Sequence, residues 1–510
     1  MRVGIVSVFT DYHRLGRHHR GAMQPQIGPL IAALLPEGVD IDVINDTWTD
    51  PDWDRRYDLL FVSCLHSDFD RAREIAHYWR QRGARTVIGG NFASAFPQLC
   101  APYFDAVAVG EPETIVPRLW QDFRNGALRP LYEAEAYDPA TTPTPRFDLA
   151  ARQQALPISL EATRGCPHVC EFCVLTGTDA GHRARPTADV VRDVLAGRRL
   201  PNHPLAWHRR KYIIFYDNNI GGNKRRLRDY CAALKPLNIR WGGCVSFNIL
   251  RDTKLLAEMA ASGCRMLFVG LESFNPATLA AMGKKQNAPA QVRAAVRRCH
   301  DLGIVLMTGL ILSPAMDDIA YIDSIPDRLD DCGLFVPTYV AFETPFPGTP
   351  QFRRLAGQPQ PAFLPNALLR DFNGYTLVTR PAHASPEEFV AAYRRLVGRL
   401  FSPASRLAKL LRDAASFLSR GHLTPLLLDA AELASEDGRV DAARTLMAGS
   451  EIPPPECGAV PFAGEDFASA AERAAIVDPW RVTDGDGRVV PAWLTAARVP
   501  ASAVALESAG

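Results

Sequence analysis

RGCPHVCEFC, residues 164–173, places three cysteines, Cys166, Cys170 and Cys173, within eight positions of the chain. Clustered thiols in a chain without an export signal bind metal or do chemistry more often than they form disulfides. Thiolates are ligands both of zinc, which usually takes four of them, and of iron–sulfur clusters. Three thiolates on a four-iron cluster leave one iron open for chemistry. A zinc site stays the alternative, with His168 as its fourth ligand.

The segment around these cysteines alternates between predicted strands and helices. Helical segments such as 253–263 and 288–303 separate the strands. The six predicted strands lie at residues 157–166, 211–219, 240–248, 265–273, 304–313 and 335–348. This order predicts a partial (β/α)6 barrel over residues 155–350, whose active site should lie at the carboxyl ends of the strands.

Residues 1–135 show the same alternation and predict a separate doubly wound, Rossmann-like parallel sheet. Ligands of such sheets bind at the carboxyl ends of the strands. The residues expected at those ends are Ser63, Gly89, Gly90, Asn91, Gly110 and Glu111. They are mostly small, so a large flat ligand could approach the backbone. Cys64 and His66 should face the same crevice.

The rest of the chain is a predicted linker, a helical domain and a tail. Residues 136–154 are the linker, and residues 351–450 are expected to be mainly helical. Within them, residues 385–401 predict an amphipathic helix that starts with a capping box. Residues 451–510 have weak periodicity and remain uncertain, as a partly irregular tail.

Composition limits the classes of function. The chain has 510 residues, 47% of them hydrophobic and 22% charged, with a net charge of +1. Such a balance argues against a dominant electrostatic grip on nucleic acid. No apolar run is long enough to span a bilayer, and the opening residues are typical of a first strand. We therefore expect a cytoplasmic protein with a small-molecule substrate.

The spacing CxxxCxΦC, with Phe172 as the aromatic residue, resembles the radical SAM superfamily. The resemblance implies that the three cysteines bind a [4Fe–4S] cluster whose open iron is chelated by S-adenosylmethionine (SAM), with Phe172 helping to seat the adenine. It also implies cofactor contacts for four polar residues at strand ends. These are Asp217, Ser246, Asn248 and Glu272. The alternative is that strand ends are polar because they meet solvent.

A doubly wound domain before such a barrel resembles the cobalamin-binding subgroup of radical SAM enzymes, through residues 87–97 and 107–119. GKKQN, residues 283–287, and the helix running into 401–403 are most similar to hopanoid methylases and related enzymes. Some cobalamin proteins supply a histidine to cobalt in the pattern D-x-H-x-x-G. Asp11, His13 and Gly16 match this pattern, but a phosphate contact or a solvated loop are alternatives for His13.

The resemblance implies a methyltransferase acting on an unactivated carbon, with SAM as both methyl donor and source of the 5′-deoxyadenosyl radical. A flavodoxin- or ferredoxin-type protein would supply electrons. The alternatives are a cyclase, rearrangement or oxidation enzyme with or without cobalamin, and a sensor without turnover. A second iron–sulfur cluster, as in methylthiotransferases, is disfavoured because Cys64 and Cys100 are too few for three ligands.

Overall fold

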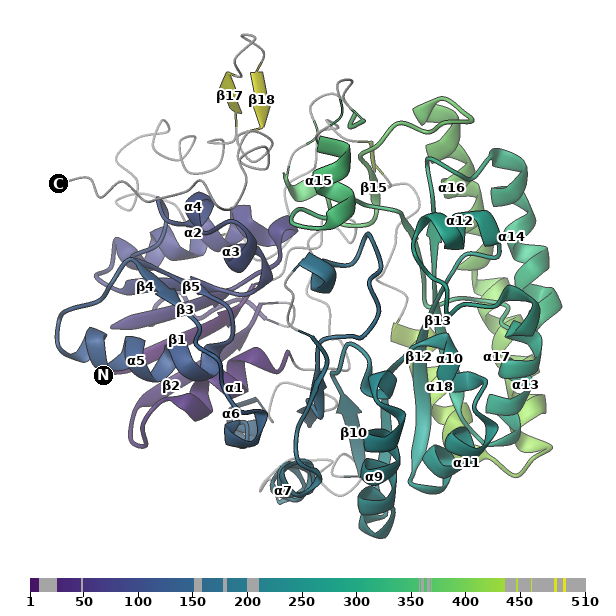
Figure 1. Cartoon of the computed structure of the whole chain (residues 1–510), viewed down its shortest axis with the longest axis horizontal. Coiled ribbons are helices and arrows are strands. Elements are labelled where there is room, and N and C mark those ends of the chain that lie inside the picture. Colours follow the sequence, from purple (N-terminus) through teal and green to yellow (C-terminus); the bar gives the residue numbers. More distant parts are fainter. Residues whose placement is uncertain are drawn as a thin grey trace.

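The computed structural model describes residues 1–8, 25–46, 49–150, 158–177, 181–199, 211–356, 358, 362–364, 367, 369–435, 446–447, 460, 481–483 and 489–491. Two bodies stand side by side in Figure 1: an N-terminal one in purple and blue, and a larger one in teal and green. Each is built on a six-stranded sheet.

The N-terminal sheet is parallel throughout, with strand order β2-β1-β3-β4-β5-β6. Its strands are β1 (Arg2–Ser7), β2 (Asp40–Asn45), β3 (Leu59–Ser63), β4 (Arg85–Gly89), β5 (Ala106–Val109) and β6 (Leu131–Glu133). The order reverses between β1 and β3, which creates the crevice where ligands of doubly wound sheets bind.

Helices cover this sheet on both faces and bury two apolar clusters against it. The helices are α1 (Ile27–Leu34), α2 (Phe69–Arg80), α3 (Asn91–Ala95), α4 (Pro97–Cys100), α5 (Pro112–Arg124) and α6 (Phe147–Ala150). Trp79 of α2 is fully buried and stacks on Trp53, with ring centroids 5.1 Å apart. The strands are buried because both faces of the sheet are covered, which accounts for their near-continuous apolar sequences.

The second sheet is the partial barrel, with strand order β14-β13-β12-β11-β10-β7 and every pair parallel. Its strands are β7 (Ser159–Leu160), β10 (Tyr212–Phe215), β11 (Arg240–Val245), β12 (Cys264–Glu272), β13 (Val305–Leu312) and β14 (Tyr339–Phe342). A short antiparallel hairpin of β8 (Thr163–Arg164) and β9 (Arg183–Ala184) follows β7.

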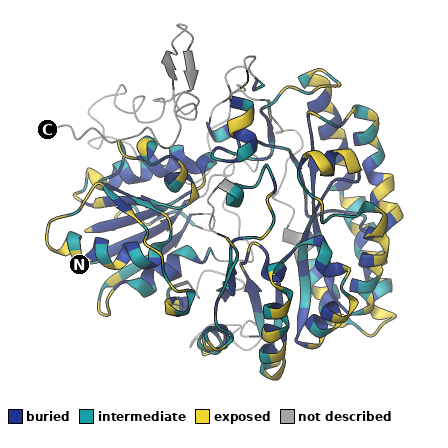
Figure 2. Ribbon diagram, in the orientation of Figure 1, coloured by how far each residue is buried: buried dark blue, intermediate teal, exposed yellow. Residues whose placement is uncertain are grey.

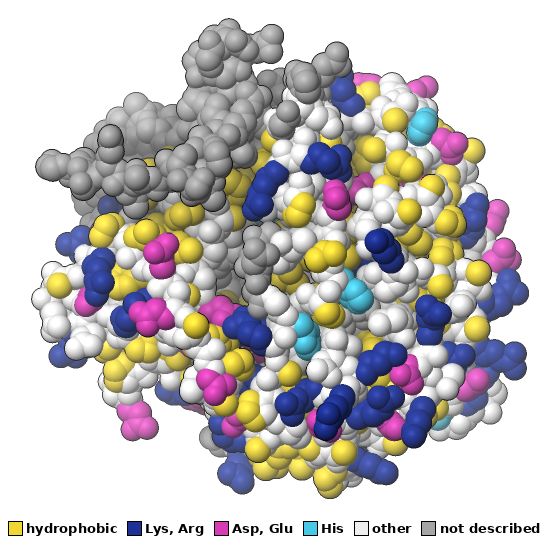
Figure 3. All heavy atoms as spheres, viewed as in Figure 1, with side chains coloured by type: hydrophobic (Ala, Val, Ile, Leu, Met, Phe, Trp, Pro, Cys, Tyr) yellow, Lys and Arg dark blue, Asp and Glu magenta, His cyan; other side chains and the backbone are white. Residues whose placement is uncertain are grey.

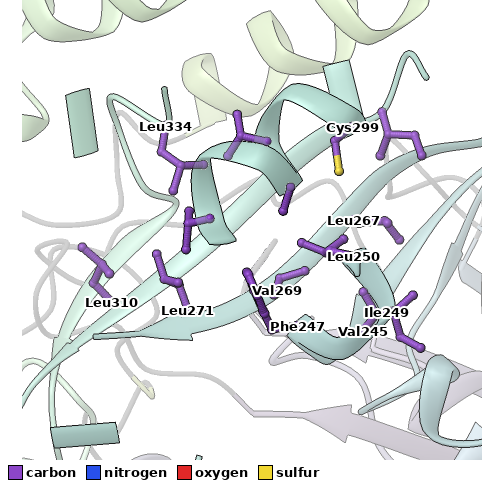
Figure 4. Close-up of a cluster of buried hydrophobic side chains, with 14 of the residues drawn as sticks. Val245, Phe247, Ile249, Leu250, Leu267, Val269, Leu271, Cys299, Leu310 and Leu334 are labelled. Carbon is purple, nitrogen blue, oxygen red and sulfur yellow. The ribbon is translucent and has the colours of Figure 1, made fainter. Parts of the chain in front are cut away.

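The barrel helices alternate with these strands and pack on the outer face. They are α7 (Thr187–Arg198), α9 (Lys224–Leu234), α10 (Phe247–Leu250), α11 (Thr253–Ala261), α12 (Pro276–Ala281), α13 (Val292–Asp301) and α14 (Ile319–Cys332). Figure 4 shows part of the core that they enclose, where Leu250, Leu267, Val269 and Cys299 meet. Apolar residues at helical spacing therefore supply the outer core, as the sequence predicts.

The C-terminal part is mainly helical. Its helices are α15 (Pro350–Ala356), α16 (Pro386–Leu400), α17 (Pro403–Leu418) and α18 (Leu423–Ser435), and its short strands are β15 (Thr376–Leu377), β16 (Leu446–Met447), β17 (Arg481–Thr483) and β18 (Val489–Pro491). The predicted capping box of α16 is present, since the Ser385 hydroxyl accepts from the Glu388 amide and Glu388 reaches back to Ser385. In Figure 2 the strands of both sheets are mostly buried, whereas the outer helices show exposed faces.

The predicted fold class, a doubly wound N-terminal domain followed by a partial (β/α)6 barrel and a helical region, is confirmed. Among the described residues, no helix is both long enough and apolar enough to cross a bilayer.

Candidate active site

The cysteine loop leaves the barrel through the β8–β9 hairpin. Gly165, with φ of 77°, makes the turn into it. A Cβ on Gly165 would lie 1.8 Å from the carbonyl oxygen of Gly181, so only glycine fits. Inside the loop the Cys173 amide donates to the Cys170 carbonyl at 3.1 Å, and the Thr176 hydroxyl donates to it at 2.9 Å. The loop is therefore folded by its own backbone.

The three thiols differ in burial and in neighbours. Cys170 is only 6% exposed, and burial raises the pKa values of both Cys170 and Cys173. The positive charge of Lys284 opposes this effect on both thiols. The Asn219 side-chain amide lies 3.5 Å from the Cys166 sulfur, which it can reach as a hydrogen-bond donor.

Glu272 ends β12 in an uncommon backbone conformation. Its φ is 64°, and the pairing of β12 with β13 shifts register between Gly270 and Glu272. A non-glycine residue in this region is a strained conformation that clusters at functional sites. One carboxylate oxygen accepts from Lys284 Nζ at 2.6 Å, while Oε2 is buried and has no partner among the described residues. Oε2 is therefore a free acceptor at the strand end.

Residues 283–287 join Glu272 to the cysteine loop. A Cβ on Gly283 would be 3.4 Å from the Val169 carbonyl oxygen, and the Lys284 ammonium lies 5.4 Å from the centre of the Phe172 ring. The Asn287 amide donates to the Gly270 and Leu271 carbonyls at 2.9 and 2.8 Å. The Leu271 carbonyl, at the register shift of β12, also accepts from the Ser273 amide at 2.9 Å.

Lys284 is charged although it is buried. Burial lowers its pKa, but Glu272 and the nearby thiols outweigh that effect and raise the pKa overall. A buried ammonium of this kind needs a partner to remain charged. Glu272 provides it.

Ser246, at the end of β11, is the centre of a second polar group. Its hydroxyl accepts from the Asn219 amide at 2.6 Å and lies 3.1 Å from His168 Nε2. Burial lowers the pKa of His168, so its imidazole is held neutral. Asn248 lies in the next turn, and its Oδ1 is buried without a partner among the described residues.

Asp217 lies deeper than the other predicted site residues. It is 1% exposed, and its carboxylate accepts from the Ala162 amide at 3.1 Å and from the amide and hydroxyl of Thr163. Burial raises its pKa to about 7. Asp217 thus fixes the chain just before the cysteine loop. Its predicted contact with a cofactor stays a prediction.

The carboxyl edge of the N-terminal sheet is made of small residues. Gly90 has φ of 105°, and a Cβ there would be 3.2 Å from the Ser63 hydroxyl. A Cβ on Gly89 would be 3.5 Å from that of Ala108 on the adjacent strand. Asn91 begins α3, and Gly110, with φ of 99°, follows β5. Since β3, β4 and β5 are neighbours, these predicted residues are brought together.

Glu111 lies at the contact between the two bodies. We call this contact, formed by Glu111 and Glu113 with Arg164 and Arg183, the seam. Arg183 of the β8–β9 hairpin donates to it through two nitrogens, one of them at 2.8 Å. Arg164, from the other strand of the hairpin, lies 3.6 Å from Glu111 and 2.7 Å from Glu113. The Arg164 guanidinium also donates to the Tyr137 hydroxyl at 2.7 Å. This ion cluster fastens the N-terminal edge beside the cysteine loop.

Two expectations about the N-terminal crevice have different outcomes. His13, with Asp11 and Gly16, lies outside the described residues, so cobalt ligation by His13 stays a prediction. Cys64 and His66, expected to face the crevice, are buried at 6% and 8% exposure. The His66 ring meets the Phe372 carbonyl, and burial lowers its pKa to about 4. Phe372 of the C-terminal part lies against His66, a contact that a strand-end pattern could not reveal.

Comparison with protein families settles the class of the barrel. The model of the radical SAM superfamily matches residues 160–321, which include the cysteine loop, Ser246 and Glu272. The chain contains a radical SAM domain. Such a domain implies a [4Fe–4S] cluster and SAM as cofactors.

The sequence similarity to named relatives extends over more residues than the radical SAM domain. The chain is 25% identical over 334 residues to bacteriochlorophyllide d C-8(2)-methyltransferase of Chlorobaculum tepidum, covering 63% of this chain and 74% of the relative. It is 27% identical over 306 residues to hopanoid C-2 methylase of Rhodopseudomonas palustris, covering 57% and 56%.

Solved structures share the arrangement of both bodies. The cobalamin-dependent SAM radical enzyme OxsB, with aqua-cobalamin bound, aligns with a TM-score of 0.58 at 14% identity over 85% of this chain and 80% of that one. The radical SAM methyltransferase TsrM of Kitasatospora setae, with cobalamin and a [4Fe–4S] cluster bound, aligns with a TM-score of 0.58 at 16% identity over 86% and 99%. At these identities the likeness shows the fold alone.

The residues of the radical SAM domain fit the two implied cofactors. The unpartnered oxygens of Glu272 and Asn248 are acceptors for hydroxyl or amino groups such as those of SAM. Among the described residues, no three His, Cys, Asp or Glu side chains converge on one ion. The match of residues 160–321 to the radical SAM superfamily therefore favours the cluster over the zinc alternative.

Sequence reasoning missed Asn219, Lys284 and the arginines of the hairpin. Asn219 follows Asp217 and Asn218 in YDNN, and the strand-end rule alone could not say which of the three enters the site. Lys284 lies in the GKKQN stretch, which carried a resemblance but no assigned role. Arg183 contacts a residue 72 positions away, so nothing local indicates its partner.

Proposed function

We propose that this chain is a cobalamin-dependent radical SAM methyltransferase that methylates an unactivated carbon of an apolar small molecule. The observation that carries the proposal is the seam. The Glu111–Arg183 pair joins the glycine-rich edge of a Rossmann-like sheet to the hairpin that leads into the cysteine loop. The ion pair thus holds the carboxyl edge of the N-terminal sheet next to the hairpin that precedes the cysteine loop. The two relatives named as methyltransferase and methylase support the same conclusion.

Each group of residues has a role in this proposal. Cys166, Cys170 and Cys173 hold the cluster, and Glu272 Oε2 accepts a hydrogen bond from SAM. Ser246 and Asn248 offer further polar contacts, with Asn219 and His168 orienting Ser246. SAM supplies, when bound, a methyl group and a carbon radical that opens a C–H bond which acid–base chemistry cannot.

The N-terminal edge is suited to a large planar cofactor. Gly89, Gly90 and Gly110 project no side chains, so a corrin could lie against the backbone. Asn91 and Ser63 are the polar groups beside them. That His13 binds the cobalt is a further part of the proposal, and it rests on the D-x-H-x-x-G pattern alone.

Exposed apolar side chains at the strand ends support an apolar substrate. Leu65 after β3 and Tyr216 after β10 are 51% and 45% exposed. Inside the barrel Phe268 and Tyr339 stack with centroids 5.8 Å apart, and Tyr339 lies across Gly309. Exposed apolar groups at a site edge mark ligand contacts. A cytoplasmic location, where the thiols stay reduced, is part of the proposal.

The test is anaerobic reconstitution with iron, sulfide and cobalamin, followed by SAM carrying a deuterated methyl group and a reductant. We expect 5′-deoxyadenosine, S-adenosylhomocysteine and methylcobalamin that carries the label, all measured by mass spectrometry. Cys170→Ala should retain less than half of the iron and form no 5′-deoxyadenosine. Cys332→Ala, a buried cysteine of α14, is the matched control and should behave as wild type.

SAM cleavage without labelled methylcobalamin would overturn methyl transfer and point to the rearrangement or oxidation alternative. Absence of any SAM cleavage in iron-loaded protein would instead support the sensor alternative.

A further inference from the structure

The outer surface of the cysteine loop has an exposed apolar centre. Val169, between Cys166 and Cys170, has the highest exposed fraction among large apolar side chains in the described part of the chain, 77%. The loop is held from two sides. A Cβ on Gly222 would lie 3.0 Å from Pro167, and one on Gly283 would lie 3.4 Å from the Val169 carbonyl oxygen. The segments that follow these two glycines therefore lie next to the cysteine loop.

Basic residues follow Gly222 almost at once. The first turns of α9 carry Lys224, Arg225, Arg226 and Arg228. Arg251 and Lys254 lie at the start of α11, which packs against α9. Figure 3 shows several dark-blue Lys and Arg side chains in the lower part of the face in view, where Figure 1 places α9 and α11.

Only part of this positive charge is neutralised. Lys224 and Arg228 share Asp252, at 3.1 and 3.4 Å. Arg225, Arg251 and Lys254 are exposed and have no acidic partner among the described residues. Lys285, two residues after Gly283 on the opposite flank of Val169, is also exposed and unpaired in the described part of the chain. Positive charge thus borders the apolar centre on two sides.

The basic residues of α9 do not stabilise their own helix. Cations near a helix N-terminus interact unfavourably with the helix dipole, by a few tenths of a kcal/mol or more each. The first turn of α9 nevertheless contains no acidic residue. The stability of α9 therefore does not account for the unpaired charge of Arg225.

We propose that Val169, Arg225, Arg251, Lys254 and Lys285 form a docking surface for a small acidic electron-carrier protein that holds a flavin or an iron–sulfur cluster. Electron transfer weakens steeply with distance, so the carrier must dock close to the loop that carries Cys166, Cys170 and Cys173, and Val169 is an exposed side chain of that loop. One electron leaves the carrier, which is oxidised by one electron, and the cluster is reduced by one. No atom or proton crosses the interface. The inference rests on the proposed function in requiring a reductant for the cluster.

An acidic protein fits this surface better than a nucleic acid. Asp229, Asp252 and Glu258 are interspersed among the basic residues, which would repel a continuous run of phosphates. A mixed rim around an apolar centre is typical of protein–protein interfaces, where charge steers the encounter.

The test compares two reductants on reconstituted holoenzyme. A flavodoxin with its NADPH-dependent reductase must dock, whereas dithionite need not. For the double variant Arg225→Glu/Lys285→Glu we expect the flavodoxin-driven rate of SAM cleavage to fall about tenfold, with the dithionite-driven rate within twofold of wild type. Binding of oxidised flavodoxin to the holoenzyme, measured by interferometry, should weaken about tenfold and lose most of its salt dependence.

Arg297→Glu, an exposed position on α13, is the matched charge reversal and should change neither rate. If the double variant loads less iron, Arg251→Glu serves as the second variant. It should lower only the flavodoxin-driven rate of SAM cleavage, by about threefold. Unchanged flavodoxin binding in all variants would overturn the docking surface. The docking surface would also be overturned if single-stranded RNA competed with flavodoxin and the same substitutions weakened the binding of the RNA.

The outcomes separate the two proposals. SAM cleavage by dithionite does not depend on methyl transfer, so failure of the methyltransferase assignment leaves this test intact. Normal dithionite-driven cleavage with normal flavodoxin binding in the variants would contradict the docking surface alone.

Discussion

The carboxyl edge of the barrel and that of the N-terminal sheet face the same region but are built differently. The barrel edge consists of charged and polar side chains that hold one another, such as Glu272 with Lys284 and Ser246 with Asn219. The N-terminal edge consists of Gly89, Gly90 and Gly110, packed against the backbone and small side chains. One edge has directed polar groups, whereas the other has accessible backbone.

The difference reflects the size of the ligand that each edge would accept. A small polar cofactor must be oriented by a few groups held rigidly before it binds, since ordering them on binding would weaken affinity. A large planar cofactor needs contact area and close approach, which side chains would obstruct. The comparison predicts that substitutions at the two edges affect different cofactors.

The largest effect should come from Glu272→Gln. Loss of a charged hydrogen-bond acceptor is worth about 1.5–3 kcal/mol, so SAM affinity should fall at least tenfold while the iron content is unchanged. Equilibrium binding to the reconstituted protein measures this. Glu343→Gln is the control, because both Glu343 oxygens are already partnered, by Ser313 and by Gln351. Equal SAM affinity for Glu272→Gln and wild type would contradict the assignment.

A change at the other edge should affect cobalamin alone. Gly90→Ala forces a Cβ into a left-handed conformation, 3.2 Å from the Ser63 hydroxyl, and should lower cobalamin retention about tenfold without changing SAM affinity. Absorbance of bound cobalamin after desalting measures the retention. Gly83→Ala places the same strain at φ of 90° with nothing within 4 Å, so it should retain cobalamin. If both variants lost it equally, strain rather than the edge would explain the result.

The smallest effect is expected at the seam between the two edges. The side chains of Arg183 and Glu111 are 31% and 27% exposed, so the pair should contribute no more than about 1 kcal/mol. Arg183→Gln and Glu111→Gln should each raise hydrogen exchange at residues 110–113 and 181–185, up to about fivefold. The double variant should add little, because the pair acts as one interaction. Arg85→Gln is the control, since Arg85 is exposed and pairs with Asp105 away from residues 110–113 and 181–185. Fully additive effects would show that the pair does not couple the two bodies.

The fold class could be predicted from local patterns in the sequence. Buried parallel strands give apolar runs, and the helices between them show helical spacing, so both sheets could be predicted locally. The cysteine spacing is equally local, because the three cysteines lie in one loop. The strand-end positions of Glu272 and Ser246 were predictable for the same reason, whereas their contacts with a cofactor stay predictions.

Only the tertiary structure decided which polar residues meet. Lys284 reaches Glu272 across 12 positions, and Asn219 reaches Ser246 across 27, through loops whose paths no periodic pattern specifies. The burial of Asp217 and His66 likewise depends on segments far along the chain that cover them. Apolar periodicity indicates whether a residue faces a core. The hydrogen-bond partner of a polar residue depends instead on how long loops fold, and no local sequence pattern predicts that.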